Sequence, residues 1–381
     1  MAPSGLFGQG GNQSLAGTGR GFWSVVHIDP ILLFLLVVLI VGGLVILFSG
    51  ADQNMALLKA QGVRMGIALV VMLVFAQFDP MVFRRWAPWL YLAGILGLGA
   101  VLLFGVGAKG AQRWLALPGL PRFQPSELMK LVVPMMAAWY LSRQFLPPRL
   151  RYVGASLLIV IMPMAMIVLQ PDLGTALLVG SAGIFVIFFA GMSWKLIGAF
   201  LSLVSVSAPL MWFFVMRDYQ KQRVLTLLDP QSDPLGAGWN IIQSKTAIGS
   251  GGMEGKGWLE GTQSHLDFLP ESHTDFIVAV LAEEFGFFGM VCLLGLYLLI
   301  VLRCLYIAAT AQDSFSRLLA GSLTMTFFIY IFVNVGMVSG LLPIVGVPLP
   351  LISYGGTSSV TLMAAFGVLM SIHTHRRMIS A

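Results

Sequence analysis

Long apolar runs recur along the whole chain, and no other feature constrains its fold as strongly. An α-helix needs about 20 consecutive, mostly apolar residues to cross a lipid bilayer. Ten runs near this length lie at about 31–49, 63–78, 87–105, 126–142, 155–170, 173–191, 196–216, 276–302, 318–341 and 356–372. The sequence therefore predicts an all-α, polytopic integral membrane protein with about ten transmembrane helices.

Composition agrees with this fold class. The chain is 57% hydrophobic and 10% charged, whereas soluble domains carry about 25% charged residues. A disordered tail, a nucleic-acid module and a disulfide scaffold are excluded. The fifth and sixth runs are separated by Gln170, Pro171 and Asp172 alone, so nine helices remain the alternative. We expect a flexible segment at 1–30, rich in Gly and Ser, and a single membrane domain at 31–381.

The loops indicate the orientation in the membrane. With the N-terminus inside, eleven Arg and Lys residues lie in inner segments and ten in outer segments, five of the ten within 217–275. Long loops count little in the positive-inside rule, and the short loops favour an inner N-terminus. An even number of spans then places both termini in the cytoplasm.

The segment 217–275, between the seventh and eighth runs, is the predicted large extracytoplasmic loop. It holds eight of the sixteen acidic residues. Loops longer than about 15 residues are usually functional when they have no secondary structure of their own. For most of these acids, however, a solvated loop surface is a sufficient explanation.

Ionisable residues inside membrane spans are costly and mark functional sites by default. Those within or beside the predicted spans are Glu127, Lys130, Asp172, Asp275, Glu283 and Glu284. In the predicted topology, four helices begin near the outer surface with polar residues, which predicts a cavity at that depth. Each charge also has a structural alternative. Asp172 can cap its helix, Glu127 and Lys130 can form an i,i+3 ion pair, and Glu283 or Glu284 can hold neighbouring helices together.

Asp275 differs because it lies where the charged loop meets the membrane. His273 is close to it, and Lys245 and Lys256 precede it in the same loop. A carboxylate there could serve as a general base, and the cations could bind a diphosphate leaving group.

Two other motifs carry no function. The stretch GSGGMEGKG at 249–257 lacks both the first Gly and the Ser or Thr of a Walker A loop. His373 and His375 have no third ligand nearby in sequence, so we predict no metal site there.

Five stretches resemble the SEDS family (shape, elongation, division and sporulation). They are GAKGAQRWL at 107–115, RFQPSELMKL at 122–131, LQPDLGTA at 169–176, the long stretch 236–284 that contains ESHTDF, and GLLPIVGVPLPLISYGGTS at 340–358. These motifs are long and specific, and they are spread over about two-thirds of the chain.

The resemblance implies a peptidoglycan glycosyltransferase of the bacterial inner membrane, active in cell elongation. It would polymerise lipid II into β-1,4-linked glycan strands, release undecaprenyl diphosphate and work with a class B penicillin-binding protein. The family pattern implies that Asp275 is catalytic. By the same resemblance, Arg122, Gln124, Glu127 and Lys130 line or support the pocket, followed by Asp172. A divalent cation, Mg²⁺ or Mn²⁺, could bind at the diphosphate, although the sequence shows no closed metal site.

Two other functions remain open at this stage. A lipid II flippase would need a polar route across the whole bilayer, whereas the charges gather on one side. A non-catalytic scaffold of the cell-wall elongation complex would not need Asp275. We therefore predict a transferase.

Overall fold

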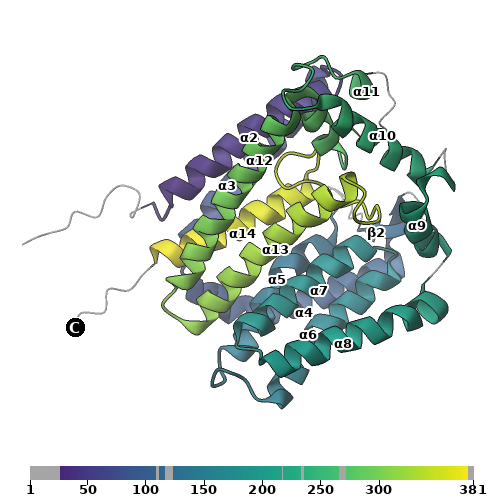
Figure 1. Ribbon diagram of the computed structural model, residues 1–381. Coiled ribbons are helices and arrows are strands. Elements are labelled where there is room, and N and C mark those ends of the chain that lie inside the picture. Colours follow the sequence, from purple (N-terminus) through teal and green to yellow (C-terminus); the bar gives the residue numbers. More distant parts are fainter. Residues whose placement is uncertain are drawn as a thin grey trace, which may run out of the picture.

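The computed structural model describes residues 26–108, 111–115, 123–216, 218–232, 236–265 and 272–375. Long helices form a bundle, and the shorter helices α9 to α11 lie at one end of it (Figure 1). The long helices are α2 (Pro30–Gly50), α3 (Met55–Gln77), α4 (Pro80–Phe104), α5 (Pro125–Leu141), α6 (Leu150–Leu169), α7 (Leu173–Phe189), α8 (Trp194–Leu210), α12 (Ile277–Ala309), α13 (Ser314–Val338) and α14 (Thr357–Thr374). The predicted all-α polytopic fold with ten long helices is confirmed within these ranges.

Eight of these helices are long and apolar enough to cross a membrane, and the other two are α5 and α7. Both have 17 residues and lie in the interior of the bundle, where α5 packs against α4, α6, α7 and α13. Most of the α5 side chains are buried. Neighbouring helices therefore shield α5 from lipid, which is why this helix can carry charged residues.

Polar residues define where several helices begin. The side chains of Asp29, Asn54, Asp79 and Asp313 accept hydrogen bonds from backbone N–H groups in the first turns of α2, α3, α4 and α13. These bonds satisfy donors that have no partner within the helix. Pro30 and Pro80 occupy the first helical position, where their missing N–H costs nothing.

The two ends of the described chain meet at the opposite end of the bundle from α9 to α11. The imidazole rings of His27 and His375 stack with 3.7 Å between centroids. Next to them, Asp29 forms an ion pair with Arg303 at 2.8 Å, and the Asp29 side chain is completely buried. The start of α2 and the end of α14 therefore lie together, as an even number of spans requires.

The predicted outer loop has secondary structure of its own. It contains α9 (Asp218–Leu228), a 3₁₀ turn (Pro230–Ser232), α10 (Ala237–Gly251) and α11 (Thr262–His265), and a π-helical turn (Met211–Val215) precedes it. Of its eight acidic residues, Asp218, Asp229, Glu254 and Glu260 are exposed, as expected for a solvated surface, whereas Asp275 is half-buried. Asp233, Asp267 and Glu271 lie outside the described residues.

The glycine-rich stretch at 249–257 docks on a break in α12. At Gly286 the backbone of α12 leaves helical geometry, and the residues on both sides bond to the stretch instead. Lys256 N–H donates to the carbonyl of Glu283 at 3.0 Å, and Phe287 N–H donates to that of Gly252 at 3.0 Å. A side chain on Gly255 would collide with the Glu284 carbonyl. The glycines therefore allow backbone-to-backbone packing, a structural role rather than phosphate binding.

A short hairpin interrupts the helices between α4 and α5. Strand β1 (Val106–Ala108) pairs antiparallel with β2 (Ala111–Trp114), and Leu115 forms a bridge with Phe123. The hairpin brings Arg113 and the start of α5 to the same end of the bundle as α9 to α11.

Candidate active site

Glu127 and Lys130 form a buried ion pair in the first turns of α5. Lys130 Nζ lies 2.6 Å from Glu127 Oε1, and both side chains are more than 90% buried. The predicted i,i+3 pair is thus present. Lys130 also lies over the ring of Tyr330, 5.0 Å from its centroid. Among the described residues, neither Glu127 Oε2 nor the Tyr330 hydroxyl has a hydrogen-bond partner.

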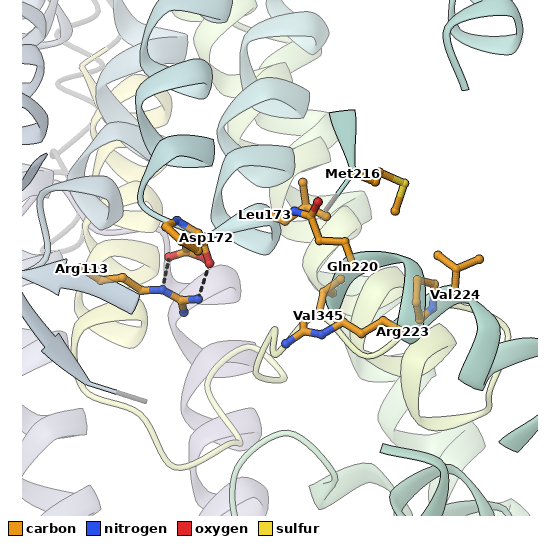
Figure 2. Close-up of a pocket in the computed structure, with 10 residues that line it drawn as sticks. Arg113, Asp172, Leu173, Met216, Gln220, Arg223, Val224 and Val345 are labelled. Carbon is orange, nitrogen blue, oxygen red and sulfur yellow. Dashed lines mark hydrogen bonds and ion pairs between the residues drawn. The ribbon is translucent and has the colours of Figure 1, made fainter. Parts of the chain in front are cut away.

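Asp172 connects three elements through its carboxylate. Its Oδ1 accepts from Thr175 N–H at 3.3 Å and so caps α7, as predicted. Its Oδ2 accepts from Gln124 Nε2 at 3.2 Å, which links α7 to the residue before α5. Arg113 Nε lies 3.7 Å from the same oxygen, and Arg113 Nη2 donates to the Pro171 carbonyl at 2.6 Å (Figure 2).

These groups surround a polar cavity of about 180 Å³. It is lined by Arg113, Gln124, Glu127, Lys130, Asp172, Thr175, Leu178, Tyr330, Gly346, Val347, Pro348, Thr357 and Ser358. The starts of α5, α7 and α14 converge here, as the positions of polar residues at helix ends predicted. In the described part of the chain no side chain caps α14, so its first backbone N–H groups add positive potential to the cavity wall.

Asp275 lies beside this cavity, in the turn that precedes α12. A Cβ atom added to Gly346, which lines the cavity, would lie 3.5 Å from Asp275 Oδ2. The Asp275 residue is half-buried. The structure therefore brings the predicted catalytic carboxylate and the Glu127–Lys130 pair to the same region, although they are 148 and 145 positions apart.

His273 is held close to the start of α14. Its carbonyl accepts from Tyr354 N–H at 2.9 Å, and the two rings meet edge to face with 6.0 Å between centroids. The guanidinium group of Arg64, on α3, lies over the Tyr354 ring, 4.4 Å from its centroid. His273 does not line the cavity itself.

Lys256 and Lys245, two cations predicted to bind the substrate, are not cavity residues here. Lys256 Nζ forms an ion pair with the buried Glu283 at 2.6 Å and donates to Thr262 at 2.8 Å. Lys245 is exposed on α10 and lies against Gly340. Arg122 lies outside the described residues.

Glu283 and Glu284 have separate structural contacts, as their different directions on the helix implied. Glu283 accepts from Lys256 and from Gln263 N–H at 3.0 Å, so it holds the loop before α11 against α12. Glu284 accepts from the hydroxyl of Ser49, which connects α12 to α2.

A second, smaller cavity of about 50 Å³ adjoins the first and shares Arg113 and Asp172 with it. Figure 2 shows Gln220 and Arg223 of α9 reaching this space from the outer segment, with Val345 beside them. Arg223, a cation of the long outer segment, thus lines a cavity that also contains Arg113 and Asp172.

Sequence reasoning missed three residues of this region: Arg113, Tyr330 and Asn334. Asn334 on α13 is completely buried, and its Nδ2 donates to the carbonyls of Asp275 and Val347 at 2.9 and 2.8 Å. Its position within the apolar run 318–341, where a polar amide is unusual, could have identified Asn334 from the sequence. Arg113 lies in a motif that the family resemblance highlighted, but its partner Asp172 is 59 positions away.

The donor set of the cavity suits an uncharged, hydroxyl-bearing ligand. Its two carboxylates, Glu127 and Asp172, each face a cation, so the four charges sum to zero. No group of three or more His, Cys, Asp or Glu side chains in the described ranges is arranged to hold a metal ion.

Comparison with known proteins extends these observations. The family model described as "Cell cycle protein" (FtsW, RodA and SpoVE) matches residues 24–378. Peptidoglycan glycosyltransferase MrdB of Escherichia coli (strain K12) is 54% identical over 361 residues, which cover 95% of this chain and 97% of that protein. Probable peptidoglycan glycosyltransferase FtsW of Geobacter metallireducens is 36% identical, covering 92% and 95% respectively.

Solved structures show the same fold. A chain from a peptidoglycan synthase complex that coordinates polymerization and crosslinking superimposes with a TM-score of 0.81 and 31% identity, covering 92% of this chain and 99% of that one. The rod shape determining protein RodA of Thermus thermophilus matches with a TM-score of 0.67 and 30% identity, covering 91% and 96%.

Proposed function

Because the chain belongs to the FtsW, RodA and SpoVE family of cell cycle proteins, we propose that it is a peptidoglycan glycosyltransferase that polymerises lipid II during cell elongation. The activity rests on 54% identity to MrdB over nearly the whole of both chains. The proposed site rests on one geometric observation, the approach of the Asp275 carboxylate to the cavity wall at Gly346.

Asp275 is the general base of the proposed reaction. Its carboxylate accepts the proton of the acceptor sugar's 4-hydroxyl while that oxygen attacks the anomeric carbon of the donor. A new C–O bond forms as the bond from the anomeric carbon to the diphosphate oxygen breaks. Undecaprenyl diphosphate departs with the bonding electrons. An α-linked diphosphate then becomes a β-1,4 glycosidic bond by inversion, which needs no enzyme nucleophile.

The cavity residues support this reaction by position and charge. The neutral, polar lining of Glu127, Lys130, Gln124 and Asp172 suits the hydroxyl groups of a sugar. The uncapped start of α14 adds positive potential where the leaving group develops negative charge. Arg122 is proposed as a further pocket residue from its place in the family motif. His273 and Lys245 are proposed to support the site from its rim, whereas Lys256 has a structural role in its ion pair with Glu283.

We also propose an orientation and a partner. The site faces the outer leaflet of the bacterial inner membrane, where lipid-linked substrate is presented, and both termini are cytoplasmic. Residues 1–30 form the cytoplasmic N-terminal segment, and 31–381 form the membrane domain. The partner is a class B penicillin-binding protein. The likeness to a chain of a synthase complex that coordinates polymerization and crosslinking supports such a pairing.

A transferase accounts for the interior better than a lipid II flippase does. Beside Lys130 lies a separate space of only about 20 Å³, lined by Lys130, Leu131, Leu323, Thr326, Tyr330, Thr361, Leu362 and Ala365. A space of this volume holds about one water molecule, so it does not form a route for a sugar head group across the bundle. A flippase would need such a route for the polar head group.

Polymerisation of lipid II by the purified chain with its partner tests the proposal. Asp275→Asn keeps the shape of the side chain but removes the base, so we expect polymer formation to fall by about 10³-fold, within the range for general bases. Glu254→Gln, at an exposed acid of the outer segment, serves as the matched control and should retain normal activity.

Three outcomes separate the candidate functions. Polymer formation that requires Asp275 supports the transferase. Lipid transport without polymer, in vesicles that contain the protein, would favour the flippase. Full rescue of cell shape by Asp275→Asn would favour a scaffold.

A further inference from the structure

The connection between α13 and α14, residues 339–356, is irregular backbone that forms a wall of the cavity. Gly346, Val347 and Pro348 line the cavity, and Leu349, Leu351, Ile352 and Ser353 are buried in the bundle. Figure 1 shows this connection turning back among the helices. Irregular backbone at such a place has to find its hydrogen-bond partners within the protein.

Three buried side chains from three different helices supply donors to this connection. Tyr297 of α12 donates its hydroxyl to the Pro350 carbonyl at 2.7 Å. Gln61 of α3 donates to the Ser353 carbonyl at 3.2 Å. Asn334 of α13 donates to the Val347 carbonyl at 2.8 Å. All three bonds hold the connection against the bundle, and only that of Asn334 reaches a residue that lines the cavity.

Asn334 differs from the other two because it also binds the candidate base. The second hydrogen of its Nδ2 goes to the carbonyl of Asp275 at 2.9 Å. Its Oδ1 is buried with no hydrogen-bond partner among the described residues. Exchange of the amide oxygen and nitrogen would point Oδ1 at two carbonyl oxygens, so the hydrogen-bond network itself assigns the orientation.

We propose that Asn334 is a positioning residue of the transferase reaction. One amide group joins the backbone of Asp275 to the backbone of Val347, next to the Gly346 that faces the Asp275 carboxylate. It therefore sets the distance between the base and the wall against which the acceptor sugar would lie. This inference rests on the proposed function, because a base must lie within hydrogen-bond reach of the hydroxyl that it deprotonates.

Steady-state polymerisation by the full chain with its partner tests this role. Asn334→Leu keeps a similar volume but removes both donors. A displacement of about 1 Å at a reacting group can cost about 100-fold in rate. We therefore expect kcat to fall about 100-fold, while KM for lipid II changes by less than about 2-fold because no side chain that lines the cavity is replaced.

Tyr297→Phe is the matched control. It deletes a buried bond to the same connection but touches neither Asp275 nor the cavity. Its kcat should stay within about 3-fold of wild type, although the loss of a buried hydrogen bond lowers its thermal unfolding midpoint. If both variants lose kcat equally, or if Asn334→Leu keeps its kcat, the positioning role is refuted.

Two further variants keep the test decisive if Asn334→Leu does not fold. Asn334→Ala removes both donors, and Asn334→Ser keeps one donor for two carbonyls, so kcat should fall in both, less in Asn334→Ser. An unchanged kcat in both would refute the role. Failure of the proposed function is distinguishable, because the wild-type chain would then form no polymer.

Discussion

A methyl group placed on Gly346 would lie 3.5 Å from Oδ2 of Asp275, so the cavity wall and the candidate base are in direct proximity. Residue 346 also has a φ angle of +75°, a conformation that side-chain-bearing residues rarely adopt. The glycine thus serves two needs, the turn of the connection and free space beside the carboxylate.

Gly346→Ala should impair both folding and catalysis. The positive φ angle costs a side-chain-bearing residue about 1–2 kcal/mol, and the new methyl group occupies space beside Asp275. We expect a lower thermal unfolding midpoint and at least about a tenfold loss of polymerisation rate, since small displacements at a reacting group are costly. Gly42→Ala is the control, because a Cβ there would meet no atom within 4 Å. Wild-type activity in Gly346→Ala would contradict this account of the wall.

The Glu127–Lys130 pair should show strong coupling between its two members. Removal of one partner leaves the other charge buried and uncompensated, which costs about 3–5 kcal/mol. We expect Glu127→Gln and Lys130→Met each to lower the unfolding midpoint sharply. The double variant should be more stable than the sum of the two losses predicts. Thermal unfolding in detergent measures this, and strictly additive losses would show that the pair is not coupled.

Lys256 should prove structural rather than substrate-binding. Its ammonium group compensates the buried carboxylate of Glu283, so Lys256→Met alone should reduce both stability and polymerisation. Adding Glu283→Leu removes the orphaned charge and should restore most of both losses. If Lys256 instead binds the diphosphate, the double variant will regain stability but stay inactive.

A divalent cation should act with the substrate and not with the free protein. Since no described cluster of side chains is arranged to hold a metal, EDTA should leave the unfolding midpoint of the substrate-free protein unchanged. We expect the chelator to reduce polymerisation, and added Mg²⁺ or Mn²⁺ to restore it. A large metal-induced rise of the midpoint without lipid II would reveal a resident site.

The helical framework could be predicted well because its causes are local. A run of about 20 apolar residues is sufficient to specify a spanning helix, and capping residues such as Asp172 and Asp313 mark helix starts over a few positions. The largest error was the start of α3, predicted near 63 and found at Met55. Its first turns carry Lys59, Gln61 and Arg64, whose polarity hides the helix from a count of apolar residues.

The candidate site was predicted in part. Polar residues at helix starts indicated a cavity, and Gln124, Glu127, Lys130 and Asp172 do line one. The role of Lys256 could not be judged from its nearness to Asp275 in sequence, because its partner Glu283 lies across a break in α12 that depends on tertiary packing. The same holds for Arg113, whose ion pair joins a hairpin to the start of α7.

Local sequence patterns are sufficient to specify a polytopic helical membrane protein and the polar residues at its helix ends. The reason is that bilayer thickness and helix capping act on residues that are neighbours in sequence. The tertiary structure alone decided which of those residues meet. Asn334 and Asp275 are 59 positions apart, and their hydrogen bond exists because α13 packs against the start of α12. Contacts of this kind follow from the packing of whole helices, which no local pattern of residues encodes.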